Sequence, residues 1–141
     1  MTVIIVVNYN KMMKSIYIIS NNSLALAKYT AYAIKVDGDV GAVFCVARDR
    51  IHQGAKLISH PLSGSIKPNQ SPYKSLVLSA QADRRLDLTS LTLIEEAIAT
   101  LLKLPVLQRQ YSACIHKDFQ VIDLDLLDSA MDALADMPDI G

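Results

Sequence analysis

The segment between His60 and Ser75 constrains the fold most, because it carries three prolines, Pro61, Pro68 and Pro72. Proline lacks the backbone donor and clashes with the preceding helical turn, so neither a continuous helix nor a central strand can run through this segment. We therefore predict a loop of about 14 residues between two apolar runs. Loops of that length are uncommon in compact domains, and such loops usually carry a function or are disordered.

This loop is basic, rich in hydrogen-bonding side chains and free of Asp and Glu. Gly64 lies between two serines and can adopt a positive φ, and the successive N–H groups of such a turn form a nest that binds anions. The sequence therefore predicts a site for a small anion, phosphate or carboxylate, or a surface that contacts a partner. The alternative is a loop that its own prolines and serine–backbone hydrogen bonds hold in shape. The candidate binding residues of the loop are His60, Ser63, Gly64, Ser65, Lys67, Asn69, Tyr73 and Lys74.

The net charge is zero, with 14 basic and 14 acidic residues, but the two signs are separated along the chain. Between residues 48 and 74 the only acid is Asp49, whereas Asp118 begins a stretch with several aspartates and no Lys or Arg. Arg48 and His52, one helical turn apart, are further candidates for an anion pocket, although cations in a last helical turn also stabilise the helix dipole. The neutral total argues against nucleic-acid binding. The acidic end is either a solvated helix face or a docking face for a partner.

Known catalytic signatures are absent from the sequence. There is no Gly-x-x-x-x-Gly-Lys-Ser/Thr loop for a nucleotide triphosphate and no Gly-x-Ser-x-Gly elbow for a serine nucleophile. Ser63 or Ser65 with His60 as base is a weak alternative, because a catalytic triad is recognised by geometry and not by local spacing. The three histidines lack metal-ligand spacing, so we expect no metal and no cofactor. The sequence assigns no catalytic residue.

At 141 residues the chain fits a single domain, and its many aliphatic and few aromatic residues predict an aliphatic core. The clearest helix runs from Val40 to His52, because its apolar residues recur every three or four positions, Asp39 can cap it and Gly54 can end it. The other predicted helices are a short one after Asn21-Asn22-Ser23, one over Leu88–Lys103 and an amphipathic one over 124–135. The predicted strands are Thr2–Val7, Ile16–Ser20, Tyr32–Val36, Lys56–Ser59, Ser75–Ser79 and Phe119–Ile122.

This alternation predicts an α/β fold with a small, mainly parallel sheet and helices on both faces, a Rossmann-like three-layer arrangement. The strand after the long loop is expected to be antiparallel, because a hairpin returns the chain without a crossover helix. Ligand sites in open α/β sheets lie at the carboxyl ends of strands, where this loop would begin. Residues 1–12 form either an N-terminal extension or an extra edge strand, since Met13 would also make a natural start.

Cysteine usage and apolar runs favour a cytoplasmic protein. Cys45 and Cys114 are far apart and fit no C-x-x-C or zinc pattern, so we expect two thiols in a reducing compartment, although the sequence leaves a disulfide open. The apolar run Val3–Val7 lacks a preceding basic region and a cleavage signature, so it does not predict a signal peptide. No run approaches the ~20 apolar residues that span a bilayer.

The run from Arg48 to Ser75, RDRIHQGAKLISHPLSGSIKPNQSPYKS, resembles the GrdX family. These are small proteins encoded beside the subunits of glycine, sarcosine and betaine reductase in amino-acid-fermenting anaerobes. The pair Asn21-Asn22 and the run from Asp118 to Asp123 are similar too, so the resemblance covers most of the chain from about Met13. Asn21 and Asn22 therefore complete the candidate ligand-binding set. The resemblance carries over no catalytic residue.

The resemblance implies an accessory role beside thiol- and selenium-dependent reductases that make acyl phosphates. The first hypothesis is a non-catalytic accessory protein whose basic loop contacts reductase subunits. The second is a small binder or enzyme that acts on a phosphorylated metabolite such as an acyl phosphate. A concave, partly buried cluster of His60, Ser63 and Lys67 would favour the second hypothesis, and a flat exposed cluster would favour the first. The sequence leaves a homodimer open.

Overall fold

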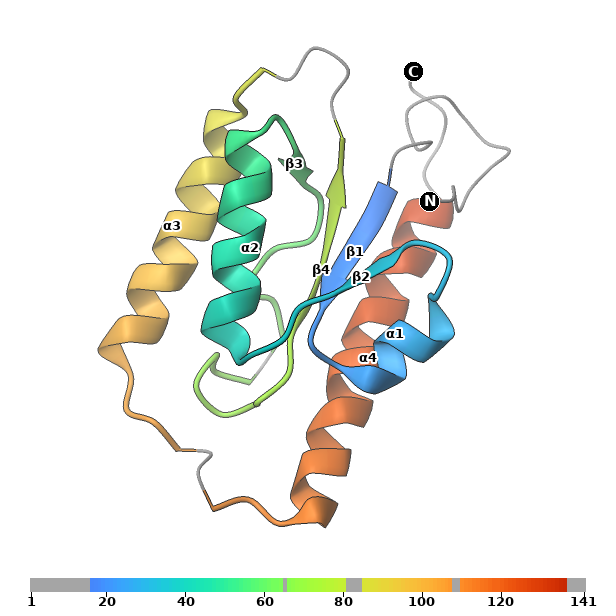
Figure 1. Cartoon of the computed structure of the whole chain (residues 1–141), viewed down its shortest axis with the longest axis vertical. Helices are drawn as coiled ribbons and strands as arrows, with labels where there is room; N and C mark the ends of the chain where they lie inside the picture. Colours follow the sequence, from blue (N-terminus) through green and yellow to red (C-terminus); the bar gives the residue numbers. More distant parts are fainter. Residues whose placement is uncertain (1–15, 65, 81–84, 108–109, 137–141) are drawn as a thin grey trace.

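The computed structural model describes residues 16–64, 66–80, 85–107 and 110–136, and Figure 1 shows their arrangement. Helices and strands alternate along most of the chain, as an α/β protein requires. In chain order the elements are β1 (Ile16–Ser20), α1 (Ser23–Lys28), β2 (Ala33–Lys35), α2 (Val40–His52), β3 (Lys56–Leu57), β4 (Ser75–Ser79), α3 (Leu88–Lys103) and α4 (Ala113–Ala135). The predicted strand Thr2–Val7 and the alternatives for residues 1–12 lie outside the described residues.

The four strands form one mixed sheet in the order β2-β1-β4-β3. Strand β1 pairs with β2 in parallel, whereas β4 pairs antiparallel with both β1 and β3. The prediction of a mainly parallel sheet is therefore wrong, while the predicted antiparallel strand after the long loop is confirmed. The physical reason is the connection, because a loop without a crossover helix returns the chain in the opposite direction. Strand β4 lies between β3 and β1. Because these two strands run in the same direction, β4 is antiparallel to both.

Helices cover both faces of the sheet, as predicted (Figure 1). Side chains of a strand alternate between its faces. On β1, Tyr17 and Ile19 pack into a core with residues of α2 and α3, whereas Ile16 and Ile18 pack into a second core with α1 and α4. The same alternation on β4 sends Leu76 and Leu78 to the first core and Val77 to the second.

Local signals define several elements well. The bounds of β1, α2, β4 and α3 are those predicted. The side chain of Asp39 caps α2 by accepting the N–H of Ala42 at 2.9 Å, and Gly54 follows the helix with a φ of 107°. Side-chain oxygens of Asn22 and Asp87 cap α1 and α3 in the same way. Caps and apolar periodicity act within a few residues, so the sequence predicts them directly.

The predicted strand Phe119–Ile122 is wrong, because these residues lie within α4. This helix begins after the cap residue Ser112 and runs on to Ala135, so the predicted helix over 124–135 is only its second half. A short apolar run does not distinguish a strand from a helical turn, and no glycine or proline interrupts residues 113–135. Strands β2 and β3 are also shorter than the predicted Tyr32–Val36 and Lys56–Ser59.

Across the residues described, none of the helices has the length and apolar character to cross a membrane. Cys45 and Cys114 are both exposed free thiols, so the disulfide that the sequence left open is not formed.

Candidate functional site

The long loop before β4 lies at the edge of the sheet where β1 and β2 end. Ser20, the last residue of β1, pairs with Lys35 of β2 and with Ser75 of β4, which brings these strand ends to one place. In Figure 1 the loop lies beside the first turn of α2, and loop residues line a hollow together with Val40 of α2 and Ile122 of α4. The loop therefore takes the position in which open α/β sheets hold their ligands, although only one strand pair here is parallel.

The side chain of Asn21 links the end of β1 to the end of the long loop. Its Oδ1 accepts the N–H of Lys74 at 2.8 Å, and its Nδ2 donates to the carbonyls of Gly38 and Pro72, both at 2.9 Å. One side chain thus joins the end of β1, the turn before α2 and the end of the long loop. Asn21 positions the site and is not among the residues that line it.

A buried polar network lies behind this contact and centres on Asp123 of α4. One carboxylate oxygen of Asp123 accepts the N–H of Ser75 at 3.0 Å, and the other accepts the Ser75 hydroxyl at 2.7 Å and Asn22 Nδ2 at 2.9 Å. The Ser75 hydroxyl in turn lies 2.8 Å from the Ser20 hydroxyl. Buried polar groups need such partners, and here they tie α4 to both central strands.

A hollow opens between the loop, α2 and α4. The space within it that the centre of a water molecule can reach is about 30 Å³, which is far below the ~300–1,000 Å³ of pockets that enclose drug-sized ligands. It suits a few water molecules or one small group, not a nucleotide. Its lining residues are Val40, Ser63, Ile66, Lys67, Pro68, Ser71, Tyr73, Lys74, Ile122, Asp123 and Leu126.

Lys74 lines this hollow together with two other charged residues, Lys67 and Asp123. Burial lowers the pKa of its ammonium below the ordinary value, and the nearby carboxylate of Asp123 offsets part of that effect. Among the residues that the structure describes, no hydrogen bond or ion pair holds Nζ of Lys74. A partly desolvated ammonium without a partner is the group that a bound anion would neutralise.

The Gly64 turn approaches α4 closely. Gly64 has a φ of 98°, a backbone conformation that favours glycine, and a Cβ added there would lie 3.0 Å from Cδ1 of Leu126. Ser63, the residue before Gly64, and Leu126 both line the hollow. Ser63 and Lys67 are exposed at the rim, and Ser65 lies outside the described residues.

Other residues of the loop are hydrogen-bonded to the connection between α3 and α4 and to the first turn of α4. Asn69 is buried and donates from Nδ2 to the carbonyl of Pro105 at 2.7 Å, away from the hollow. The Tyr73 hydroxyl lies 2.9 Å from Nδ1 of His116, and the Tyr111 hydroxyl donates to the Gln70 carbonyl at 2.9 Å. These contacts give the loop a fixed shape, so it is more than a solvated linker.

His60, by contrast, does not reach the hollow. Its side chain is exposed, and its Nδ1 accepts the N–H of Leu62 at 3.0 Å within the loop. Only the backbones of His60 and Ser63 are bonded to each other, at 3.2 Å. The geometry therefore provides no nucleophile–base pair of the kind considered for Ser63.

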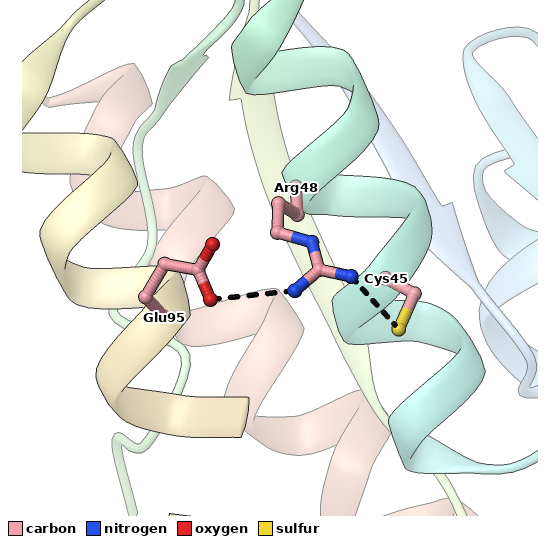
Figure 2. A network of polar contacts seen from close by, with 3 residues as sticks. All are labelled: Cys45, Arg48 and Glu95. Carbon is pink, nitrogen blue, oxygen red and sulfur yellow. Dashed lines mark hydrogen bonds and ion pairs between the residues drawn. The ribbon is translucent and has the colours of Figure 1, made fainter. Parts of the chain in front are cut away.

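Arg48 and His52 also lie elsewhere. Figure 2 shows the Arg48 guanidinium between two side chains, with one nitrogen 3.3 Å from Glu95 of α3 and the other 3.9 Å from Sγ of Cys45. His52 is the exposed last residue of α2, whose first residue, Val40, lines the hollow. A helix of 13 residues separates its two ends by about 18 Å, so His52 lies far from the hollow, and Arg48, His52 and His60 are not among its lining residues.

One residue of the site, Asp123, was missed at the level of sequence. Asp123 precedes the buried Leu127 and Met131 by four and eight positions, so it lies on the apolar face of α4. That helical spacing indicates a buried aspartate, but the prediction of a strand over 119–122 left the first half of α4 unrecognised. Within the described ranges no group of three His, Cys, Asp or Glu could hold a metal ion.

Fold and site together define an α/β protein with a small, partly charged hollow at the strand ends of a mixed sheet. The chain belongs to the family of GrdX-like proteins, whose family model matches residues 17–132 and so covers most of the chain. This confirms the resemblance. The comparisons with curated proteins and with solved structures found no match to this chain.

Proposed function

We propose that this protein is an accessory protein of a glycine-reductase-type system and that it binds a small anion in the hollow beside Lys74. Membership of the GrdX-like family supports the first part. The second part rests on one observation, the partly buried ammonium of Lys74 that lines a hollow and has no hydrogen-bonding partner among the described residues.

The chemistry of the walls favours a small anion with one negative charge. Asp123 lines the same hollow as Lys74, and its carboxylate would repel a dianion more than a monoanion. Val40, Ile122 and Leu126 line the hollow with apolar surface, which lowers the local dielectric and strengthens the attraction to Lys74. A small carboxylate meets these conditions.

A second candidate is a phosphorylated metabolite such as an acyl phosphate. It is favoured by Lys67, which lines the hollow at its rim and adds a second cation near Lys74. Two ammonium groups are a common arrangement for a phosphoryl group, which carries more charge than a carboxylate. In this candidate both lysines bind the phosphoryl oxygens, whereas in the first one Lys74 is sufficient.

Thermal unfolding in the presence of acetate, phosphate or acetyl phosphate, each at the same ionic strength, tests both candidates. An anion at 100 times its dissociation constant adds about 2.7 kcal/mol, which raises the melting temperature by several degrees. We expect the increase to disappear in Lys74→Met, which removes the charge and keeps most of the apolar stem. It should persist in Lys103→Met, a matched change at an exposed lysine of α3.

An increase with acetate alone that also survives Lys67→Met favours the carboxylate, whereas one with phosphate or acetyl phosphate that needs both lysines favours the second candidate. Equal increases in the wild type and Lys74→Met would contradict anion binding in the hollow. The accessory role is tested separately, by retention of purified glycine reductase subunits on the immobilised protein. Retention of none of them would contradict it.

A further inference from the structure

The hollow holds two opposite charges that are not paired with each other. Lys74 and Asp123 both line it, and the charge of Asp123 opposes the lowering of the Lys74 pKa by burial. Yet among the described residues the structure has no ion pair between them, although it forms three others on its surface. Opposite charges that share a small, partly apolar space at a separation greater than 4 Å leave room for a group between them.

Asp123 also has hydrogen-bonding capacity left. A carboxylate accepts about four hydrogen bonds, two on each oxygen. Among the residues that the structure describes, Oδ2 accepts from Asn22 and from the Ser75 hydroxyl, whereas Oδ1 accepts only the N–H of Ser75. These contacts leave one acceptor position on Oδ1 unused, and Asp123 lines the hollow that a donor would enter.

We propose that the hollow binds a small zwitterion, with its carboxylate on Lys74 and its ammonium on Asp123. This inference rests on the proposed anion binding at Lys74 and names the class of ligand, an α-amino acid with a minimal side chain. A carboxylate alone leaves the charge of Asp123 uncompensated and is repelled by it, and an ammonium alone is repelled by Lys74. A zwitterion satisfies both charges and brings no net charge into the hollow.

The apolar walls limit the size of the zwitterion. Ile66, Pro68 and Leu126 line the hollow with Ile122, and the accessible space of about 30 Å³ leaves no room for a branched side chain. The walls also lower the local dielectric, which strengthens both ionic contacts. The residues that line the hollow therefore favour a ligand that is both small and zwitterionic.

Glycine, acetate and methylammonium separate the two ends of such a ligand, because acetate lacks the ammonium and methylammonium lacks the carboxylate. We would titrate each one, and L-leucine, into the protein at neutral pH and follow the amide NMR signals of residues around the hollow. We expect glycine to bind about tenfold or more tightly than acetate, because a charge-assisted hydrogen bond is worth that factor or more. Methylammonium should not bind, and L-leucine should bind at least tenfold more weakly than glycine.

Asp123→Asn should make glycine and acetate bind equally, and Asp125→Asn, an exposed change two residues further along α4, should leave the wild-type ratio. The comparison of ligands on the wild type decides the matter even where Asp123→Asn does not fold. Equal affinities for glycine and acetate, both lost in Lys74→Met, would overturn the zwitterion and leave anion binding intact. Binding of glycine that does not depend on Lys74 would overturn both proposals. Binding of none of the four would overturn the zwitterion and the carboxylate candidate, and the phosphoryl candidate is then decided by thermal unfolding with phosphate and acetyl phosphate.

Discussion

Asp123 illustrates how a single residue can carry both packing and chemistry. It is 6% exposed, it lies on the apolar face of α4, and it joins that helix to the ends of β1 and β4 through Asn22 and Ser75. Burial of an aspartate at such a position has an unfavourable free energy, because the carboxylate loses its hydration. Three hydrogen bonds from described residues offset that cost, and Asp123 also lines the hollow.

Replacement of Asp123 by alanine should destabilise the protein by about 2–4 kcal/mol, because the buried N–H of Ser75 loses its acceptor and the network around it is broken. Asp125→Ala, at an exposed position in the same helix, should change stability by no more than about 0.5 kcal/mol. Equilibrium unfolding in urea measures both. Similar losses for the two variants would contradict a special role for Asp123.

At the scale of elements, α4 is held to α1 by a polar contact on the surface of the second core. The Tyr29 hydroxyl donates to Oδ1 of Asp128 at 2.5 Å, and Nζ of Lys28 lies 2.9 Å from Oδ2 of the same residue. Burial and this bond to Asp128 raise the pKa of the Tyr29 hydroxyl well above its ordinary value. The contact thus has a pH dependence that can be measured.

Tyr29 should make the protein less stable in alkaline solution. An unfolded tyrosine ionises near pH 10, whereas folded Tyr29 keeps its proton, so the stability it contributes is complete below about pH 10 and falls as the pH rises further. Tyr29→Phe should therefore lose less stability between about pH 9 and 11 than the wild type. Lys74, whose pKa burial lowers, acts in the opposite direction and is common to both proteins.

Urea unfolding at a series of pH values measures this slope. Tyr32→Phe is the matched control, because it leaves the contact between Tyr29 and Asp128 in place and should keep most of the wild-type slope. A slope in Tyr29→Phe as steep as that of the wild type would show that Tyr29 does not hold its proton in the folded state.

At the scale of the whole molecule, one sheet joins two cores. Alternate residues of β1 enter opposite cores, so Tyr17 and Ile18 are neighbours in sequence and lie on different sides of the sheet. If either layer of helices unfolds, the apolar face of the sheet that it covers becomes exposed to water. The charge separation along the sequence is also resolved at this scale, because Lys74 from the basic region comes to lie near Asp123 of the acidic helix.

We expect the two layers to unfold together in a single transition. Both cores share the central strands β1 and β4, so the loss of either one removes the support of the other. Urea unfolding followed by far-UV circular dichroism and by tyrosine fluorescence should give coincident curves. Two separated transitions would show that the layer of α1 and α4 is an independent unit.

The sequence by itself determined the elements whose signals are local. Apolar periodicity and the caps Asp39 and Asp87 define α2 and α3, the prolines define the loop before β4, and the motif from Arg48 to Ser75 indicates the family. Each of these signals is contained in a short stretch of chain, so no knowledge of the fold is needed to interpret it.

Only the tertiary structure decided which residues of the loop meet a partner and which do not. The insertion of β4 between β1 and β3, the pairing of Arg48 with Glu95, and the bond from Asn22 to Asp123 join residues that are distant in sequence. Lys74 lines the hollow and His60 does not, although both belong to the same basic loop. The physical reason is that charge and hydrogen-bonding capacity are properties of a residue, whereas burial and partners arise only when separate segments pack together.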